Sequence, residues 1–172
     1  DKAKISKISF VGDKKFKDST LKSVILSEEY RFWKFISGKK YLNENLINYD
    51  IRLLNNFYKN KGFYNVEIES SFASYLGKDE FEVLYNISSG KKYYFNQFNL
   101  NLPIDYELNN FDELNKIFNN LKGEKYSLNS IDKILKEIDK IVLNKQFEFL
   151  KSSVNEEIKD NFINLTFDIG ES

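Results

Sequence analysis

The sequence predicts an α+β fold of two tandem small domains, each with the order strand, helix, helix, strand, strand. The chain contains a repeat of roughly 80 residues, which is the size of a whole small domain. An alternating apolar run at 81–87 recurs at 163–169, and a helical pattern precedes each run. Two helices cover only one face of a three-stranded mixed sheet, so each domain has two layers. We place the domains at residues 1–90 and 91–172.

The first domain begins with an alternating strand at 5–11, which the turn pair Gly12-Asp13 ends. The polar pair Asp18-Ser19 then offers a cap for a short helix. The segment 28–40 is rich in large apolar side chains, and we expect it to fold back onto the domain. The residues of this predicted structural aromatic loop are Phe32, Trp33, Phe35 and Tyr41.

A longer helix is predicted at 43–61, where apolar residues recur at helical spacing. Gly62 stands at its end, where a helix C-terminus favours a residue with positive φ. Alternation of Tyr64, Val66 and Ile68 with polar residues then predicts the first, half-buried strand of a hairpin.

The second domain opens with a predicted strand at 98–102, closed by the single proline of the chain. The segment Asn110–Glu113 has the pattern of a capping box before a helix, and Ser127 is placed to cap the longer helix that follows. A hairpin begins at 147–154. Its predicted turn, 155–160, is acidic and longer than two residues.

Composition argues against an enzyme or a metalloprotein. The chain has no histidine and no cysteine, which removes the commonest metal ligands and the thiolate nucleophile. Adjacent acids occur at Glu28-Glu29, Asp79-Glu80 and Glu156-Glu157, all in predicted turns or loops where carboxylates are solvated. No phosphate-binding loop or dinucleotide motif is present. We therefore expect no enzymatic activity, no cofactor and no metal.

The chain is expected to be a fragment or a processed product, because it contains no methionine. No apolar run is long enough to span a bilayer as a helix, and no signal peptide is present. The 26 basic and 26 acidic residues balance, so no phosphate-tracking surface is predicted. The abundance of Lys, Asn and Ile indicates an AT-rich genome.

An RNA-binding alternative comes from the element order, which the KH domain shares. Lysines and aromatics also interleave at Lys39-Lys40-Tyr41 and at 91–95, as they do in single-strand binders. The KH clamp needs a GXXG loop between the helices, and the loop around Gly38 lacks the second glycine. Together with the zero net charge, this favours no nucleic-acid partner and leaves a KH-like module as an alternative.

Sheet edges are the binding feature that this architecture offers. A three-stranded sheet has two edge strands, and an edge can pair with another extended chain through backbone groups. Most edges of small sheets bind nothing, but we expect the strand after the helices to be the open edge in each domain. The candidate polypeptide-binding residues are Phe147, Glu148, Phe149, Leu150, Lys151, Ser152 and Ser153 in the second domain, and Tyr64, Val66 and Ile68 in the first.

Aromatic and glycine positions in the first domain carry a family resemblance. They are Arg31-Phe32-Trp33-Lys34-Phe35, Tyr41, Asp50–Leu54, Phe57-Tyr58, Gly62-Phe63 and the opening Ile8–Asp13 with Phe16 and Leu21. This pattern resembles the second POTRA domain of the BamA family of outer-membrane β-barrel assembly factors. The second repeat, by order and spacing, resembles the third POTRA domain, although Gln146 stands where a glycine is expected.

The resemblance implies a non-enzymatic periplasmic scaffold arm, joined to a C-terminal membrane barrel that is absent from this fragment. Such an arm receives unfolded outer-membrane proteins by strand addition and docks accessory lipoproteins of the BamB type for β-barrel folding and insertion. The resemblance points to the edge at 147–153 first and to the edge at 64–70 second. The alternative within the same fold is the POTRA arm of a related transporter, of the two-partner secretion or TamA type.

Overall fold

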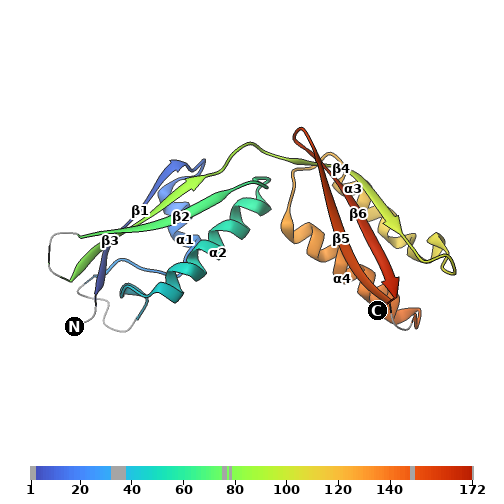
Figure 1. Cartoon of the computed structure of the whole chain (residues 1–172), viewed down its shortest axis with the longest axis horizontal. Coiled ribbons are helices and arrows are strands. Elements are labelled where there is room, and N and C mark those ends of the chain that lie inside the picture. Colours follow the sequence, from blue (N-terminus) through green and yellow to red (C-terminus); the bar gives the residue numbers. More distant parts are fainter. Residues whose placement is uncertain (1–2, 32–37, 75–76, 78, 148–149, 172) are drawn as a thin grey trace. The chain divides into compact units, whose positions relative to one another are not determined.

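The computed structural model describes residues 3–31, 38–74, 77, 79–147 and 150–171 (Figure 1). The chain divides into two compact units: Asp1–Lys59 with Asn65–Gly90, and Asn60–Tyr64 with Lys91–Ser172. Each unit has an α+β arrangement with one three-stranded mixed sheet, which confirms the predicted fold class. The placement of the domains at residues 1–90 and 91–172 stays a prediction. None of the helices in the described part of the chain is both long and apolar enough to cross a membrane.

The first unit follows the predicted order of elements. They are β1 (Lys4–Asp13), α1 (Asp18–Val24), the 3-10 helix η1 (Gly38–Lys40), α2 (Glu44–Asn60), β2 (Glu67–Ser74) and β3 (Glu80–Ser88). β3 is the central strand, parallel to β1 and antiparallel to β2. Its alternate residues Val83, Tyr85 and Ile87 are buried, and the long helix α2 lies along one side of the sheet (Figure 1).

A buried carboxylate joins three parts of the first unit. Asp50 on α2 is fully buried, and its Oδ1 accepts hydrogen bonds from the backbone N–H groups of Leu26 (2.8 Å) and Ser27 (3.3 Å). Its Oδ2 accepts from the hydroxyl of Tyr85 on β3 (2.7 Å). Burial, and then the hydrogen bond to Asp50, raise the pKa of Tyr85 well above its ordinary value. The carboxylate therefore fixes the segment after α1 to both the long helix and the central strand.

Gly12 lies within a strand rather than ending one. The sequence predicts a turn at Gly12-Asp13, but β1 continues to Asp13, and Gly12 pairs with Ile87 of β3. Gly12 has φ +92°, and a Cβ atom there would lie 2.3 Å from the carbonyl oxygen of Ile87. The turn prediction was wrong because this glycine serves a close approach of two backbones, which is the other common use of glycine in sheets.

The second unit repeats the arrangement. Its elements are β4 (Tyr94–Asn101), the 3-10 helix η2 (Leu108–Phe111), α3 (Glu113–Leu121), α4 (Leu128–Asn144), β5 (Leu150–Lys159) and β6 (Phe162–Glu171). β6 is central, parallel to β4 and antiparallel to β5. β4 begins earlier than the predicted strand at 98–102, because a register shift between Phe95 and Phe98 breaks the alternation from which a strand is recognised.

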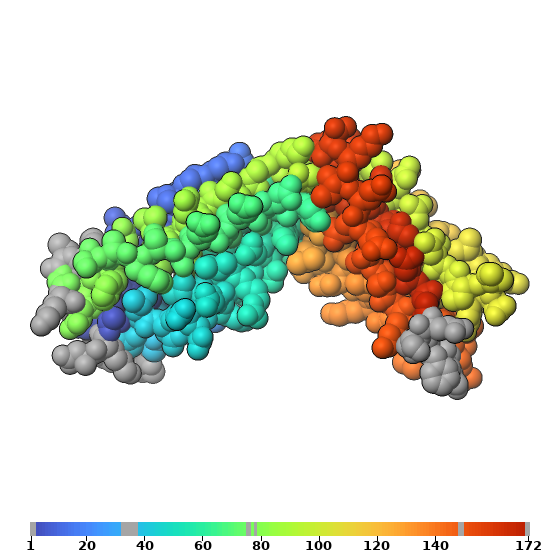
Figure 2. Space-filling model, in the orientation of Figure 1, coloured from blue at the N-terminus to red at the C-terminus, as the bar shows by residue number. Residues whose placement is uncertain are grey.

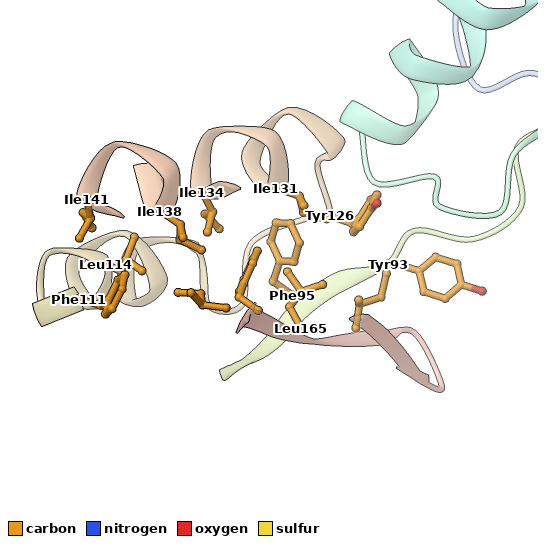
Figure 3. Packing of buried hydrophobic residues seen from close by; sticks show 13 residues of the cluster. Tyr93, Phe95, Phe111, Leu114, Tyr126, Ile131, Ile134, Ile138, Ile141 and Leu165 are labelled. Carbon is orange, nitrogen blue, oxygen red and sulfur yellow. The ribbon is translucent and has the colours of Figure 1, made fainter. Parts of the chain in front are cut away.

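The core of the second unit lies between its sheet and its two α-helices. Figure 3 shows the isoleucines of α4 directed towards the side chains of Phe95 and Leu165 on the sheet. Phe111 and Leu114 close the far end of this cluster, and Tyr126 closes the other. The isoleucines recur at the spacing of a helix face, which is why the pattern predicts α4 correctly. They are Ile131, Ile134, Ile138 and Ile141.

The predicted helix caps had different outcomes. The pair Asp18-Ser19 does not cap α1, because the helix begins at Asp18 itself, after the extended Lys17, and no side-chain capping bond forms there. Ser127 is extended (φ −147°) and its Oγ accepts from the N–H of Ser130 at 3.4 Å, which confirms the predicted cap of α4. The capping box at Asn110–Glu113 was wrong. The chain enters α3 directly from η2, so Asp112 already has helical dihedral angles and its side chain makes no capping bond. A cap requires an extended residue at that position.

The predicted long turn at 155–160 was also wrong. β5 continues through these residues to Lys159, which pairs with Phe162. Only Asp160 and Asn161 remain for the turn, and Asp160 takes a positive φ of 57°. Asp and Asn tolerate this conformation better than most residues, so an acidic segment can end in a tight hairpin.

Candidate functional site

β5 is an edge strand of the second sheet, as the sequence predicts. The strand order is β4-β6-β5, so in the described part of the chain β5 pairs with β6 on one side only. Leu150 and Val154 are half-buried and pack on the core, whereas Lys151 and Ser153 are exposed on the opposite face. The β5–β6 hairpin, coloured orange to red, lies at the surface in Figure 2.

The hairpin geometry shows which backbone groups of β5 point outward. Lys159 and Phe162 flank a two-residue turn, and such flanking residues hydrogen-bond to each other. Because paired residues alternate between bonded and non-bonded positions, every second residue of β5 directs its N–H and C=O away from β6. Counting back along the strand, these residues include Ser152 and Val154. Their outward backbone groups form the candidate binding edge.

Side-chain hydrogen bonds fix the edge from both faces of the sheet. On the helix side, the hydroxyl of Ser152 donates to Oδ1 of Asp139 on α4 at 2.9 Å. On the other face, Asp168 of β6 accepts from Nδ2 of Asn155 (2.7 Å) and from Nδ2 of Asn101 (2.9 Å). This second face is polar and carries cross-strand bonds. The hydrogen-bonding groups of β5 that remain available to a partner are therefore its outward backbone N–H and C=O groups.

The predicted binding residues of the second unit do not all lie in β5. Leu150, Lys151, Ser152 and Ser153 do. Glu148 and Phe149 lie outside the described residues. Phe147 lies before β5, so its placement in the edge strand was wrong, while a role in binding stays a prediction. Its N–H donates to the carbonyl oxygen of Val142 (3.0 Å), and its ring contacts that of Tyr106 (4.9 Å between centroids). Phe147 closes the end of α4 and belongs to the core.

The predicted edge of the first unit is shifted along the chain. β2 begins at Glu67, so it includes Ile68 but not Tyr64 or Val66. The placement of these two residues in the strand was wrong, and their role in binding stays a prediction. Tyr64 lies in a turn and packs its ring against those of Tyr93 (5.6 Å) and Tyr126 (5.0 Å) in the second unit's core. Alternating burial in this segment reflects packing around a turn rather than strand pairing.

Phe72 is a candidate that the sequence prediction missed. It lies on β2, which is the edge of the β1-β3-β2 sheet, and its side chain is 48% exposed. Ile68 and Phe72 are four residues apart in one strand, so they share a face. The alternation of apolar residues is interrupted at Ser70, so the sequence gives only a weak signal for Phe72.

Acidic and aromatic groups meet beside β5. Burial raises the pKa of Tyr126 well above its ordinary value, and the negative charge of Glu156 on β5 raises it further. The same two causes raise the pKa of Tyr64. Both hydroxyls therefore remain neutral across the physiological range.

The lysine and aromatic clusters lie partly inside the molecule. Lys40 is only 5% exposed, and its ammonium lies over the ring of Tyr30 (5.4 Å). The ammonium groups of Lys91 and Lys92 lie over aromatic rings at 5.3 and 5.8 Å. Of the predicted aromatic loop, Phe32, Trp33 and Phe35 lie outside the described residues. Tyr41 is half-buried and bridges to β1 at Lys4.

The described residues bring no three potential metal-ligating side chains together.

Comparisons with known proteins agree on one family. The sequence model of the POTRA family, described as a surface antigen variable number repeat, matches residues 3–90, just over half of the chain. The outer membrane protein assembly factor BamA of Buchnera aphidicola is 25% identical over 96% of this chain. The chain spans 27% of the length of that relative.

Two solved structures share the fold. The BamA POTRA3-5 structure from Haemophilus influenzae has a TM-score of 0.70 at 17% identity, covering 98% of this chain and 66% of its own. The POTRA1-2 structure of the periplasmic domain of Omp85 from Anabaena has a TM-score of 0.60 at 14% identity, covering 100% of this chain and 97% of its own. At these identities the likeness shows two tandem domains of the POTRA fold.

Proposed function

The chain belongs to the POTRA family, and from that premise we propose that it is a periplasmic arm of a BamA-type outer-membrane protein assembly factor. The names of its relatives support the assignment: one is an outer membrane protein assembly factor, and another is the periplasmic domain of an Omp85 protein. The arm carries out no chemistry. It binds unfolded outer-membrane polypeptides on their way to a membrane barrel.

The observation that carries this proposal is the one-sided pairing of β5. Ser152 and Val154 direct N–H and C=O groups away from the sheet, and an extended chain can pair with them. Backbone hydrogen bonds do not depend on which side chains the partner carries, so one edge can accept the many different sequences of outer-membrane strands. The edge of β2, with Ile68 and the exposed ring of Phe72, is the second site.

Two finer parts of the proposal rest on the resemblance. Accessory lipoproteins of the BamB type dock on this arm, and the two domains correspond to the second and third POTRA domains of the full assembly factor. A POTRA arm of the two-partner secretion or TamA type is the alternative, and there the same β5 edge would receive a transported polypeptide. Membership of the POTRA family excludes the KH-like alternative.

A pair of variants at one position tests strand addition at β5. Ser152→Pro removes the outward N–H together with the bond from the hydroxyl to Asp139, whereas Ser152→Ala removes only that hydroxyl bond. We expect Ser152→Pro to abolish binding of a fluorescent peptide from an outer-membrane strand, and Ser152→Ala to bind it like the original chain. Equal binding by all three proteins would refute strand addition at β5.

A second proline variant checks the assignment of outward and inward residues. The N–H of Ser153 points towards β6 in the same alternation, so Ser153→Pro should lower the melting temperature through loss of a bond inside the sheet. Ser152→Pro, on the outer side, should lower it less. If Ser152→Pro is the more destabilising variant, the alternation along β5 is reversed.

A further inference from the structure

A hollow lined by both apolar and polar side chains lies at the opposite edge of the same sheet. It has a volume of about 270 Å³ and is formed by β4, η2 and α3. We call it the β4 groove. Its lining residues are Phe98, Asn99, Leu100, Leu108, Phe111, Asp112, Asn115 and Phe118. None of them belongs to β5, so the groove is independent of the edge discussed above.

Part of the outer edge of β4 is already paired. The N–H of Phe95 donates to the carbonyl oxygen of Glu124 (2.9 Å), and the carbonyl oxygen of Phe95 accepts from the N–H of Gly123 (2.9 Å). Tyr126 likewise donates to the carbonyl oxygen of Tyr93 (2.8 Å). The chain's own segment 123–126 thus shows that this side of β4 supports strand-like pairing.

The remainder of that edge is open. The register shift places Phe95 opposite Ile163 and Phe98 opposite Leu165, two residues further along β6. Residues two apart in a strand point their backbone groups the same way, so Phe98 directs its N–H and C=O outward as Phe95 does. Leu100, two residues further along β4, likewise directs its N–H and C=O outward. In the described part of the chain, no strand covers Phe98 or Leu100.

The floor of the β4 groove is aromatic, and its lining combines apolar side chains with Asn99, Asp112 and Asn115. The ring of Phe98 stacks on that of Phe118, with centroids 5.1 Å apart and planes at 12°. Phe111 is buried below, while Leu108 stands at the rim with 61% of its surface exposed. A hollow of this size is near the lower limit of ligand pockets, roughly 300 Å³, and suits one large apolar side chain.

The lining of the β4 groove contains one charged residue, Asp112, and the chain segment around it is acidic. The segment 101–115 contains Asp105, Glu107, Asp112 and Glu113 and no lysine or arginine, in a chain whose total charge is zero. All four carboxylates are exposed, and Asp112 lines the hollow itself. An acidic segment beside an aromatic floor is complementary to an apolar side chain flanked by Lys or Arg.

We infer that the β4 groove binds an extended, basic segment of a partner polypeptide. The segment pairs with the backbone of Phe98 and Leu100, continuing the line of bonds that 123–126 begins. It places an apolar side chain beside Leu108 and a Lys or Arg next to Asp112. The second unit then has two polypeptide-binding edges. The β5 edge binds without regard to side chains, whereas the β4 groove selects apolar and basic residues.

Charge reversal at Asp112 tests the inference. The probe is a synthetic nine-residue peptide with a central Phe flanked by lysines, and the comparison peptide carries glutamates in their place. Asp112→Lys should weaken binding of the lysine peptide about three- to tenfold, and strengthen binding of the glutamate peptide. The matched control is Glu44→Lys, which reverses an acid in the first turn of α2 in the other unit and should change neither affinity. Equal effects of the two variants would reduce the interaction to general charge attraction and overturn the inference.

Two exposed leucines provide a control that does not depend on charge. Leu108→Ala removes an apolar side chain from the lining of the β4 groove, whereas Leu143→Ala truncates a 77% exposed leucine at the end of α4. Only Leu108→Ala should weaken binding of the lysine peptide, while both variants keep the melting temperature. If Leu108→Ala binds as well as Leu143→Ala, no side chain enters the groove.

Amide shifts separate this site from the β5 edge. The lysine peptide should shift residues 98–101 and 108–118, and these shifts should persist in the Ser152→Pro variant. Shifts confined to 150–154, or lost in Ser152→Pro, would overturn the β4 groove while leaving strand addition at β5 intact. Shifts at 98–101 and 108–118 without any at 150–154 would support the β4 groove and count against strand addition at β5.

Discussion

Replacing Asp50 with Ala should strongly destabilise the first unit. The change leaves the hydroxyl of Tyr85 and the N–H of Ser27 without their acceptor, and both residues are at least 96% buried, at 0% and 4% exposure. The N–H of Leu26 loses its bond as well, but Leu26 is 36% exposed and water can reach it. Each buried donor left without an acceptor costs about 1–3 kcal/mol, and release of the buried charge offsets part of this. We expect a net loss of about 3 kcal/mol.

The isosteric Asp50→Asn is the control for this change. Its amide oxygen can still accept from the two backbone N–H groups, so it should cost only about 1–2 kcal/mol. Tyr85→Phe removes the third donor, and the Asp50→Ala and Tyr85→Phe double variant should be less destabilised than the sum of the two single ones.

Urea unfolding followed by the fluorescence of Trp33 provides the assay. Trp33 is the only tryptophan of the chain, and its number falls in the sequence range 1–59 of the first unit. The midpoint should fall in Asp50→Ala with an unchanged slope, because the surface exposed on unfolding is the same. A loss below about 1 kcal/mol, or no difference between the Ala and Asn variants, would refute the conclusion that Asp50 joins the segment after α1 to α2 and β3.

Three further predictions concern stability. Gly12→Ala should cost at least about 2 kcal/mol in urea unfolding, since its φ is +92° and its Cβ would meet the backbone of Ile87; a neutral result would mean that the strands separate easily there. Ser127→Ala should cost about 0.5–1 kcal/mol through loss of the α4 cap, and Ser127→Asp should restore most of it. Burial raises the pKa of Tyr58 to about 12, so the free energy of unfolding should be constant below pH 10 and fall between pH 10 and 12, where the unfolded chain ionises first. Tyr58→Phe should make that fall shallower without abolishing it, because the pKa values of Tyr64, Tyr85 and Tyr126 are raised as well, and an unchanged pH profile would contradict the assignment.

The periodic elements could be predicted from the sequence because their cause is local. The isoleucines of α4 and the alternating β3 and β6 each bury one face against a single core, so spacing alone identifies them. β4 was harder, since the irregularity between Phe95 and Phe98 shifts the alternation by one residue. The sequence therefore shows only the second half of that strand.

Aromatic residues next to helix ends misled the prediction of strand residues. Tyr64 and Phe147 each follow a long helix and precede an alternating strand, so both looked like strand residues. Their rings instead pack on the core of the second unit, through Tyr126 and Tyr106. Spacing cannot distinguish an aromatic that alternates in a strand from one that closes a helix end, because both are buried at the same intervals.

The β4 groove could not be predicted from the sequence at all. Phe98 and Leu108 are ten residues apart, and the hollow exists only because η2 and α3 lie beside the open half of β4. The acidic run 101–115 was visible, but its meaning depends on the apolar surface that it borders.

The central claim is that the β5 edge receives extended polypeptide, and an amide-shift titration of the isotope-labelled chain tests it most directly. The titrants are a peptide from an unfolded outer-membrane strand and, as a control, single-stranded RNA. We expect the peptide to shift the amide signals of residues 150–154 and the RNA to shift no amide signal. Shifts around Lys39–Tyr41 and 91–95 with RNA, and none at 150–154 with peptide, would contradict the claim.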